Sequence, residues 1–299
     1  MRSKKNNGEP DPPYIGRFAP SPTGELHFGS LLAALASYLD AKHHRGLWLL
    51  RMEDLDPERE PTGAASSILQ ALEKFGLHWD GPVLYQSTRL EAYQSVLDEL
   101  TAAGMIYPCS CSRKRVRALG GIYDGHCRFH CPKPGPHAMR VYVGTANPGF
   151  TDLIQGPFSQ NLAASSGDFI VRRRDGLFAY QLAVVIDDHY QEINHIVRGA
   201  DLLESTPRQI YLQQLLSAPC PVYAHIPIAT NALNQKLSKQ HFAEVLDLAQ
   251  APRQLNQALC FLGQKPPAGS EQETVEQQLQ WAVRNWDIQR VPKLATIRI

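Results

Sequence analysis

The chain has 299 residues, of which 43% are hydrophobic and 20% are charged, and its formal net charge is +1. This length is sufficient for one large or two ordinary domains, and the composition is that of an ordinary globular protein. No apolar run reaches the roughly 18 residues of a membrane helix, so we expect no membrane span. A net charge near zero excludes a general attraction to nucleic acid, so any RNA site must be a local basic patch.

Residues 1–13 form a polar segment with several prolines and without the apolar centre of a signal peptide. We therefore expect a flexible, uncleaved tail and a cytoplasmic protein.

Residues 14–107 are expected to form the first half of an α/β domain. Apolar segments at 14–18 and 47–52 are typical of buried strands, and the apolar spacing between them predicts a helix. This βαβ order predicts a parallel sheet. Two further apolar stripes predict helices over 68–75 and 90–100.

Residues 108–151 differ in composition, since cysteine, glycine, proline and basic residues dominate, and we expect an insertion there. The domain resumes over 152–240, with strands predicted at 169–173, 179–186, 195–197 and 223–228 and a helix at 207–216. Residues 241–299 predict a helical C-terminal region, whose last helix lies near 274–285.

Two segments are suited to phosphate chemistry. Gly24, His27, Gly29 and Ser30 fall where the first strand turns into a helix, and helix N-termini bind phosphate. Lys236 and Lys239 flank a serine in a polar stretch that is suited to neutralising a departing pyrophosphate. The alternatives are an ordinary turn with a solvated histidine and a solvated basic loop.

Residues 17–30 resemble the HIGH region of class I aminoacyl-tRNA synthetases, with His27-Phe28-Gly29-Ser30 at the motif, and residues 236–240 resemble the KMSKS loop. Residues 51–57, 85–87 and 198–208 are similar to segments of glutamyl-tRNA synthetases. The resemblance covers about residues 14–245. Within this group, residues 120–128 and the short length resemble the glutamyl-queuosine tRNA(Asp) synthetases, which are truncated paralogues.

The resemblance implies a Rossmann-like parallel-sheet catalytic domain with a zinc-binding insertion and no anticodon-binding domain. It also implies activation of glutamate by ATP, followed by transfer onto queuosine in the anticodon stem-loop of tRNA(Asp), by a monomer. Three alternatives stay open. They are a glutamate- or RNA-binding paralogue without ligase activity, a conventional glutamyl-tRNA synthetase, and a zinc-dependent RNA-binding module. The first alternative stays open because Ser30 stands in place of the second histidine of the motif.

The same resemblance implies a glutamate site. Arg17 and Arg198 would hold the two carboxylates, which guanidinium groups fit well, and Glu53 would hold the ammonium group. Tyr180 and the segment Phe18, Ala19, Pro20 and Ser21 would line the pocket. Structural ion pairs and core packing are the alternatives for these side chains. Asp187 and Asp188, expected near a strand end, are secondary candidates for the ammonium group.

For ATP, the resemblance implies His27, Gly29, Ser30, Lys236 and Lys239 as binding or catalytic residues, with Mg²⁺ accompanying the nucleotide.

Four cysteines at positions 109, 111, 127 and 131 fall within a short stretch, which in a cytosolic chain indicates a metal before a disulfide. The resemblance implies one structural zinc ion held by Cys109, Cys111, Tyr123 and Cys127. His126, His130 and Cys131 compete for the fourth position, and unliganded thiols are the alternative.

Two basic runs, at 113–117 and 172–174, are suited to an RNA backbone and equally to a solvated surface.

Overall fold

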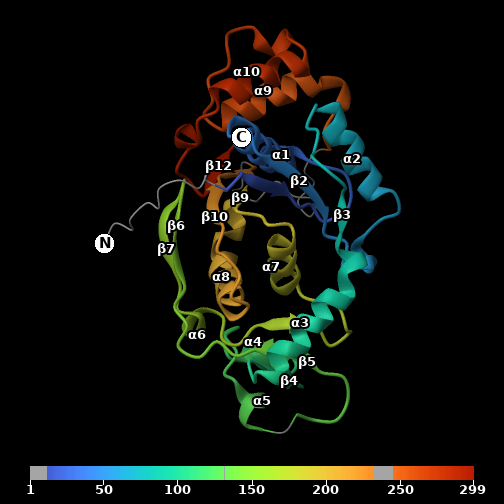
Figure 1. The fold of residues 1–299 in the computed structure, drawn as a ribbon, viewed down its shortest axis with the longest axis vertical. Helices are drawn as coiled ribbons and strands as arrows, with labels where there is room; N and C mark the ends of the chain where they lie inside the picture. Colours follow the sequence, from blue (N-terminus) through green and yellow to red (C-terminus); the bar gives the residue numbers. More distant parts are fainter. Residues whose placement is uncertain (1–11, 131, 232–244) are drawn as a thin grey trace.

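The computed structural model describes residues 12–130, 132–231 and 245–299. The molecule is elongated, with the helices α9 (Ala251–Phe261) and α10 (Val275–Asn285) at one end and the cysteine-containing insertion at the other (Figure 1). Among the described residues, no helix is long and apolar enough to cross a membrane.

The centre of the fold is a set of parallel strands. β1 (Ile15–Phe18), β2 (Leu47–Met52) and β3 (Leu84–Tyr85) pair in parallel in the order β1-β2-β3. β9 (His195–Gly199) pairs in parallel with β10 (Val222–Ile226). The backbone N–H of Asn194 donates to the carbonyl of Ile15 at 3.0 Å, which joins the two groups beside β1. The predicted parallel sheet is confirmed.

Four predicted helices are also confirmed. α1 (Phe28–His43) connects β1 to β2, and its residues Leu31, Leu35 and Leu39 are at most 1% exposed, which explains the apolar spacing in the sequence. The other three are α2 (Ala64–Lys74), α3 (Leu90–Ala102) and α8 (Thr206–Leu215). The helix predicted near 274–285 is confirmed as well: Thr274 and Gln277 form a capping box that starts α10.

The insertion is built on an antiparallel sheet. β4 (Ile106–Cys109), β5 (Ala138–Val141) and β8 (Ile170–Arg172) pair in that order, and the short helices α4 (Arg113–Ala118) and α5 (His126–Phe129) lie between β4 and β5. Between β5 and β8 the chain forms a hairpin of β6 (Gly149–Asp152) and β7 (Gly156–Ser159), and then the single turn α6 (Leu162–Ser165).

The strand predicted at 179–186 is wrong. These residues lie in helix α7 (Tyr180–Tyr190), so Asp187 and Asp188 are helical and not near a strand end. All residues from Leu182 to Asp188 are buried, and a helix buried on all sides has a continuous apolar run that periodicity does not distinguish from a buried strand. Val184, Val185 and Ile186 favoured the strand because β-branched residues are enriched in strands.

The C-terminal region contains a strand that was not predicted. β12 (Thr296–Arg298) pairs in parallel with β11 (Ile228–Thr230), which directly follows β10. The chain therefore returns from α10 to pair with the segment after β10, in a separate two-stranded sheet. A 3-10 helix, η3 (Ala200–Ser205), leads from β9 into α8.

Candidate active site

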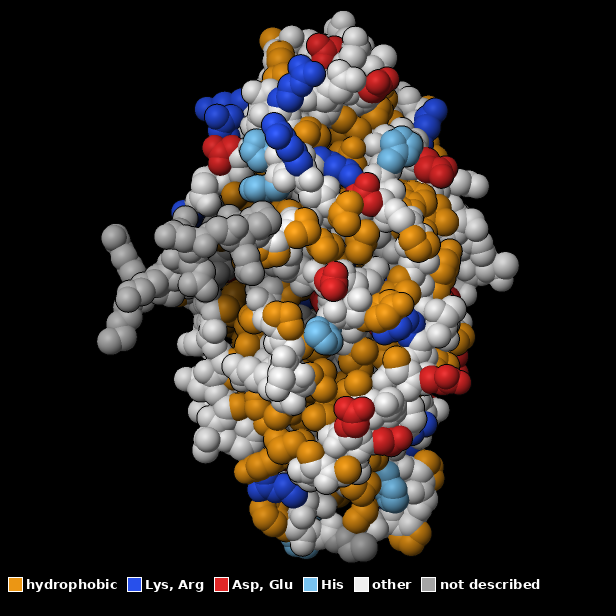
Figure 2. Space-filling model, in the orientation of Figure 1, with side chains coloured by type: hydrophobic (Ala, Val, Ile, Leu, Met, Phe, Trp, Pro, Cys, Tyr) orange, Lys and Arg blue, Asp and Glu red, His pale blue; other side chains and the backbone are white. Residues whose placement is uncertain are grey.

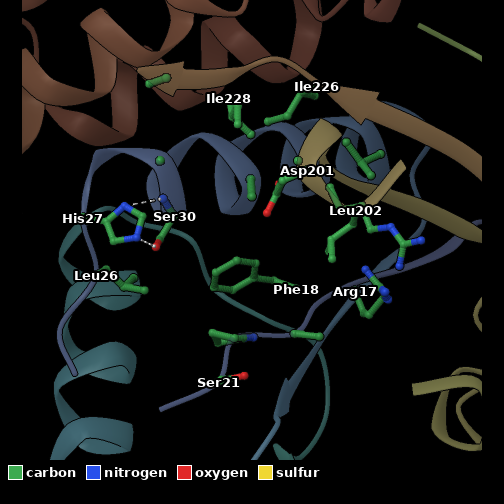
Figure 3. A pocket seen from close by; sticks show the side chains of 18 of the residues that line it. Arg17, Phe18, Ser21, Leu26, His27, Ser30, Asp201, Leu202, Ile226 and Ile228 are labelled. Atoms are coloured by element: carbon green, nitrogen blue, oxygen red, sulfur yellow. Dashed lines mark hydrogen bonds between the residues drawn. The ribbon is translucent and has the colours of Figure 1, made fainter. Parts of the chain in front are cut away.

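A cavity of about 520 Å³ lies at the carboxyl ends of β1, β9 and β10, beside the N-terminus of α1. This is where ligands bind in open α/β sheets. Figure 3 shows His27 and Arg17 at opposite sides of the cavity, with Phe18 between them. The cavity brings together ten of the predicted site residues, namely Arg17, Phe18, Ala19, Pro20, Ser21, His27, Gly29, Ser30, Tyr180 and Arg198.

His27 caps the N-terminus of α1. Its Nδ1 accepts a hydrogen bond from the backbone N–H of Ser30 at 3.3 Å, and its Nε2 lies 3.2 Å from Ser30 Oγ (Figure 3). An Nδ1 that accepts leaves the proton on Nε2, so the neutral ring donates to Ser30 Oγ. The ring and the first N–H groups of the helix thus lie in the same wall of the cavity, an arrangement suited to anionic oxygens.

Arg17 projects from β1 and is held by Asp188 of α7. Arg17 Nε donates to Asp188 Oδ1 at 3.0 Å, and Arg51 Nη2 donates to the same oxygen at 2.7 Å. Burial alone would raise the pKa of the Asp188 carboxyl, but the two guanidinium groups beside it lower the pKa below its usual value. Asp188 therefore orients two arginines and is not available as the main partner of a ligand ammonium group.

Glu53 does not line this cavity but a smaller one of about 220 Å³, which Ser21 and Tyr180 also line. Its Oε1 is 3.6 Å from Arg51 Nη2, and no described residue donates a hydrogen bond to that oxygen. Burial raises the pKa of Glu53 to about 7, although Arg51 and Arg17 lower it. A buried carboxylate in this position is suited to a cation. Tyr180 and Ser21 also line the larger cavity, so the two cavities are neighbours.

Arg198 projects from β9 and is 4% exposed. Its Nη2 donates to Thr206 Oγ1 at 2.8 Å and to Gln209 Oε1 at 2.7 Å, and its Nε donates to His225 Nε2 at 3.1 Å. No described residue accepts a hydrogen bond from its buried Nη1. The Nε and Nη2 groups of Arg198 are therefore fixed by protein, and the buried Nη1 is suited to a carboxylate oxygen.

Lys236 and Lys239 lie outside the described residues, so their predicted contact with phosphate remains a sequence-based prediction.

The predicted metal ligands converge in the insertion. The sulfur atoms of Cys109, Cys111 and Cys127 lie within 4.8 Å of one another. The Tyr123 hydroxyl is 3.4 Å from Cys109 Sγ and 3.7 Å from Cys111 Sγ. These three sulfurs could hold a metal ion, and the buried tyrosine oxygen lies against them.

Neighbouring groups favour thiolate at Cys127, whereas burial raises the pKa of the Cys111 thiol. Burial alone would raise the pKa of the Cys127 thiol, but hydrogen bonds from Tyr123, Ser110 and Cys111 lower it to about 6. Arg140 Nε also donates to Cys109 Sγ at 3.2 Å. Of the competitors for the fourth ligand, His126 and His130 stack on each other at 4.1 Å, and Cys131 lies outside the described residues.

Several arginines of the two basic runs form ion pairs or hydrogen bonds within the protein. Arg115 pairs with Asp124 at 2.6 Å, Arg173 pairs with Asp56 and Asp175, and Arg174 donates to the backbone of Ser110. Figure 2 shows Lys and Arg side chains scattered among acidic ones on the visible face, in agreement with the net charge of +1.

Two kinds of site residue were missed. Asp201 is the one carboxylate among the described residues that line the large cavity, and Figure 3 shows it at the cavity wall. The signal was its place in the segment 198–208, three residues after Arg198. Arg51 shares Asp188 with Arg17, and the pair Asp152 and His225 supports Arg198. Spacing alone gives no signal for such contacts between distant parts of the chain.

The fold and site define a nucleotide-binding α/β protein with paired cationic groups at one side of its cavity. A family model described as "tRNA synthetases class I (E and Q), catalytic domain" matches residues 15–290. The chain belongs to this family, and it is therefore a ligase of the aminoacyl-tRNA synthetase type.

Relatives that match nearly the whole chain carry a more particular name. The chain is 52% identical over 292 residues to "Glutamyl-Q tRNA(Asp) synthetase" of Neisseria meningitidis serogroup C, a match that covers 94% of this chain and 98% of that protein. It is 49% identical over 284 residues to the protein of the same name from Pseudomonas aeruginosa, covering 95% and 97%.

Among solved structures, the glutamate tRNA ligase from Elizabethkingia meningosepticum, crystallised in complex with its amino acid, matches with a TM-score of 0.78 at 26% identity. The match covers 95% of this chain and 66% of that one, so this chain spans about two thirds of its length.

Proposed function

We propose that this chain activates glutamate with ATP and transfers the glutamyl group onto queuosine in the anticodon of tRNA(Asp), in the cytoplasm. The observation that carries the proposal is the shared cavity in which His27 at the start of α1 faces Arg17 across Phe18, and which Arg198 also lines. The relatives that share about half of the sequence are named for this activity.

Glutamate occupies the side of the cavity with the arginines. Two carboxylates require two cationic anchors, and Arg17 and Arg198 are both buried and both oriented by hydrogen bonds before a ligand arrives. Glu53 receives the ammonium group, because a buried carboxylate is most stable beside a positive charge. Tyr180 and residues 18–21 close the wall around the ligand.

ATP occupies the side with His27. In the first step a carboxylate oxygen of glutamate attacks the α-phosphorus of ATP, the bond to the β-phosphate bridging oxygen breaks, and pyrophosphate leaves. As negative charge develops, the N–H groups at the start of α1 donate to phosphate oxygens, and the Nε2–H of His27 exchanges Ser30 Oγ for a phosphate oxygen. Lys236 and Lys239 neutralise the departing pyrophosphate.

Two metals accompany this proposal. Mg²⁺ is usually bound by one or two carboxylates together with substrate phosphates, and Asp201 supplies a carboxylate in the cavity wall. Such an ion would neutralise phosphate charge. In the insertion, zinc fits three sulfurs and a tyrosine oxygen at the distances observed, and Cys109, Cys111, Tyr123 and Cys127 would hold one structural ion there.

In the second step a hydroxyl of queuosine attacks the activated carbonyl of glutamate, an ester forms, and AMP leaves. The chain acts on tRNA(Asp) as a monomer.

Replacing His27 by alanine tests the activation step. We expect glutamate-dependent ATP–pyrophosphate exchange to fall by about 100-fold or more, since a positioned group that stabilises transition-state charge contributes on that order. The matched control is His189→Ala, because His189 is exposed near the end of α7 and does not line the cavity. Exchange that survives in the His27 variant, with the fold intact, would contradict the phosphate role of His27.

A further inference from the structure

Arg198 is held by acceptors from two neighbouring elements. His225 lies in β10, Thr206 and Gln209 lie in α8, and together they take the hydrogen bonds of its Nε and Nη2. The amide of Gln209 is itself oriented, because its Nε2 donates to Gln181 Oε1 at 2.9 Å. These contacts define the orientation of the guanidinium plane.

Whether His225 accepts from Arg198 depends on which nitrogen of its ring carries the proton. Its Nδ1 lies 2.6 Å from Asp152 Oδ2, and both side chains are completely buried. Asp152 Oδ1 accepts the backbone N–H groups of Ile154, Gln155 and His225 at 2.9–3.1 Å, so that oxygen is already occupied. An ionised carboxylate only accepts, which places the imidazole proton on Nδ1 and leaves Nε2 as an acceptor for Arg198.

Two local effects keep the pair in this state. Burial is the main cause that lowers the pKa of His225, so the ring is neutral near pH 7. Burial alone would raise the pKa of Asp152, but hydrogen bonds from His225 and from backbone N–H groups lower it, so the carboxylate is ionised. A protonated or tautomerised ring would present an N–H to the Nε–H of Arg198 and lose the hydrogen bond.

From this geometry we infer that Asp152 and His225 are positioning residues for amino-acid recognition: they set the imidazole tautomer that holds Arg198 ready for a substrate carboxylate. The inference rests on the proposed glutamate site. Asp152 ends β6 of the hairpin beside β10, so a residue of the hairpin controls a side chain of the cavity.

Asp152→Asn is the direct test. If the amide oxygen keeps the three backbone N–H groups, the amide nitrogen faces His225 Nδ1 and drives the proton to Nε2, against Arg198. We expect the KM for glutamate in pyrophosphate exchange to rise about 10- to 100-fold, by analogy with the loss of an outer-shell residue that orients a metal ligand. The KM for ATP should stay within about threefold of that of the unmodified protein, because Arg198, the side chain that loses its support, lies on the glutamate side of the cavity.

Asp40→Asn is the matched control. Asp40 is also 2% exposed, and it accepts from Tyr14 and Trp286, none of which lines the cavity. It reports the general cost of neutralising a buried carboxylate, and we expect an unchanged KM for glutamate. An equal rise in both variants would overturn the inference.

His225→Gln separates positioning from packing. The glutamine Oε1 is an acceptor near the place of Nε2, so we expect this variant to keep the KM for glutamate within about threefold, and Asp152→Asn in this background to add no further rise. If Asp152→Asn raises KM equally in both backgrounds, or in neither, the inference is wrong. Nitrogen-15 spectra of the unmodified protein give a second measurement that needs no variant, and a His225 ring protonated on Nε2 would also overturn it.

Arg198→Ala distinguishes this inference from the proposed function. An unchanged KM for glutamate in that variant would contradict the glutamate site itself. A raised KM there, together with an unchanged KM in Asp152→Asn, would contradict only the positioning role.

Discussion

At the scale of single residues, a few side chains determine how the two arginines of the site are oriented. Arg17 and Arg198 were predicted from the sequence and both line the cavity, yet their partners were not predicted. Arg17 is held by Asp188, which is 171 positions away in the sequence, and Arg198 by His225, which is 27 positions away. Contacts of this kind depend on tertiary structure, so a motif indicates the binding residue and leaves its supporting residues undetermined.

Glu53 gives a prediction about pH. Because its folded pKa is about 7, the carboxyl is mostly protonated at pH 6 and mostly ionised at pH 8. Only the ionised form binds an ammonium group, so we expect the KM for glutamate to fall about tenfold as the pH rises from 6 to 8. Steady-state exchange measured across this range is the check.

Glu53→Gln is the control for this pH dependence. We expect the variant to bind glutamate weakly and with a KM that is flat between pH 6 and 8. The same pH dependence in the variant would show that another group titrates, and the ammonium assignment would then fail.

At the scale of elements, the regular part of the α/β domain was predictable. β2 was predicted with its observed bounds, Leu47–Met52, and α1 followed from apolar spacing. α7 was predicted as a strand because all its faces are buried, which removes the polar side on which helical periodicity depends. β12 is three residues long and mostly exposed, so its sequence carries no strand pattern.

The insertion gives a prediction about metal. Cys111→Ser removes one of the three convergent sulfurs, so we expect zinc content to fall from about one ion per chain to well below it, with a lower melting temperature, because a structural zinc site stabilises the fold that holds it. Elemental analysis and thermal unfolding are the measurements.

Cys260→Ser is the matched control, since Cys260 is exposed and lies outside the cluster. Full zinc content in the Cys111 variant, or no zinc in the unmodified protein, would contradict the proposed site. Glutamate activation should be retained in both variants, because neither cysteine lines the cavity.

At the scale of the whole molecule, the elongated shape places the cavity and the cysteine cluster far apart. The cavity lies at the central sheet, and the cysteine cluster lies in the insertion at the end away from α9 and α10 (Figure 1). The residues of the 17–30 motif were predicted to share one site and they line one cavity, because the motif is short and follows the end of β1. The RNA surface was not predictable in this way, because several of the basic side chains that indicated it pair with acidic residues instead.

The most direct test of the proposed function is the transfer of labelled glutamate to purified tRNA. We predict stable labelling of tRNA(Asp) that carries queuosine and no labelling of the same tRNA without it. Tyr123, Arg17 and His27 need not be altered for this experiment, so the result does not depend on the stability of any variant. Equal labelling of both tRNAs, or labelling of tRNA(Glu) at its terminal ribose, would contradict the proposed function.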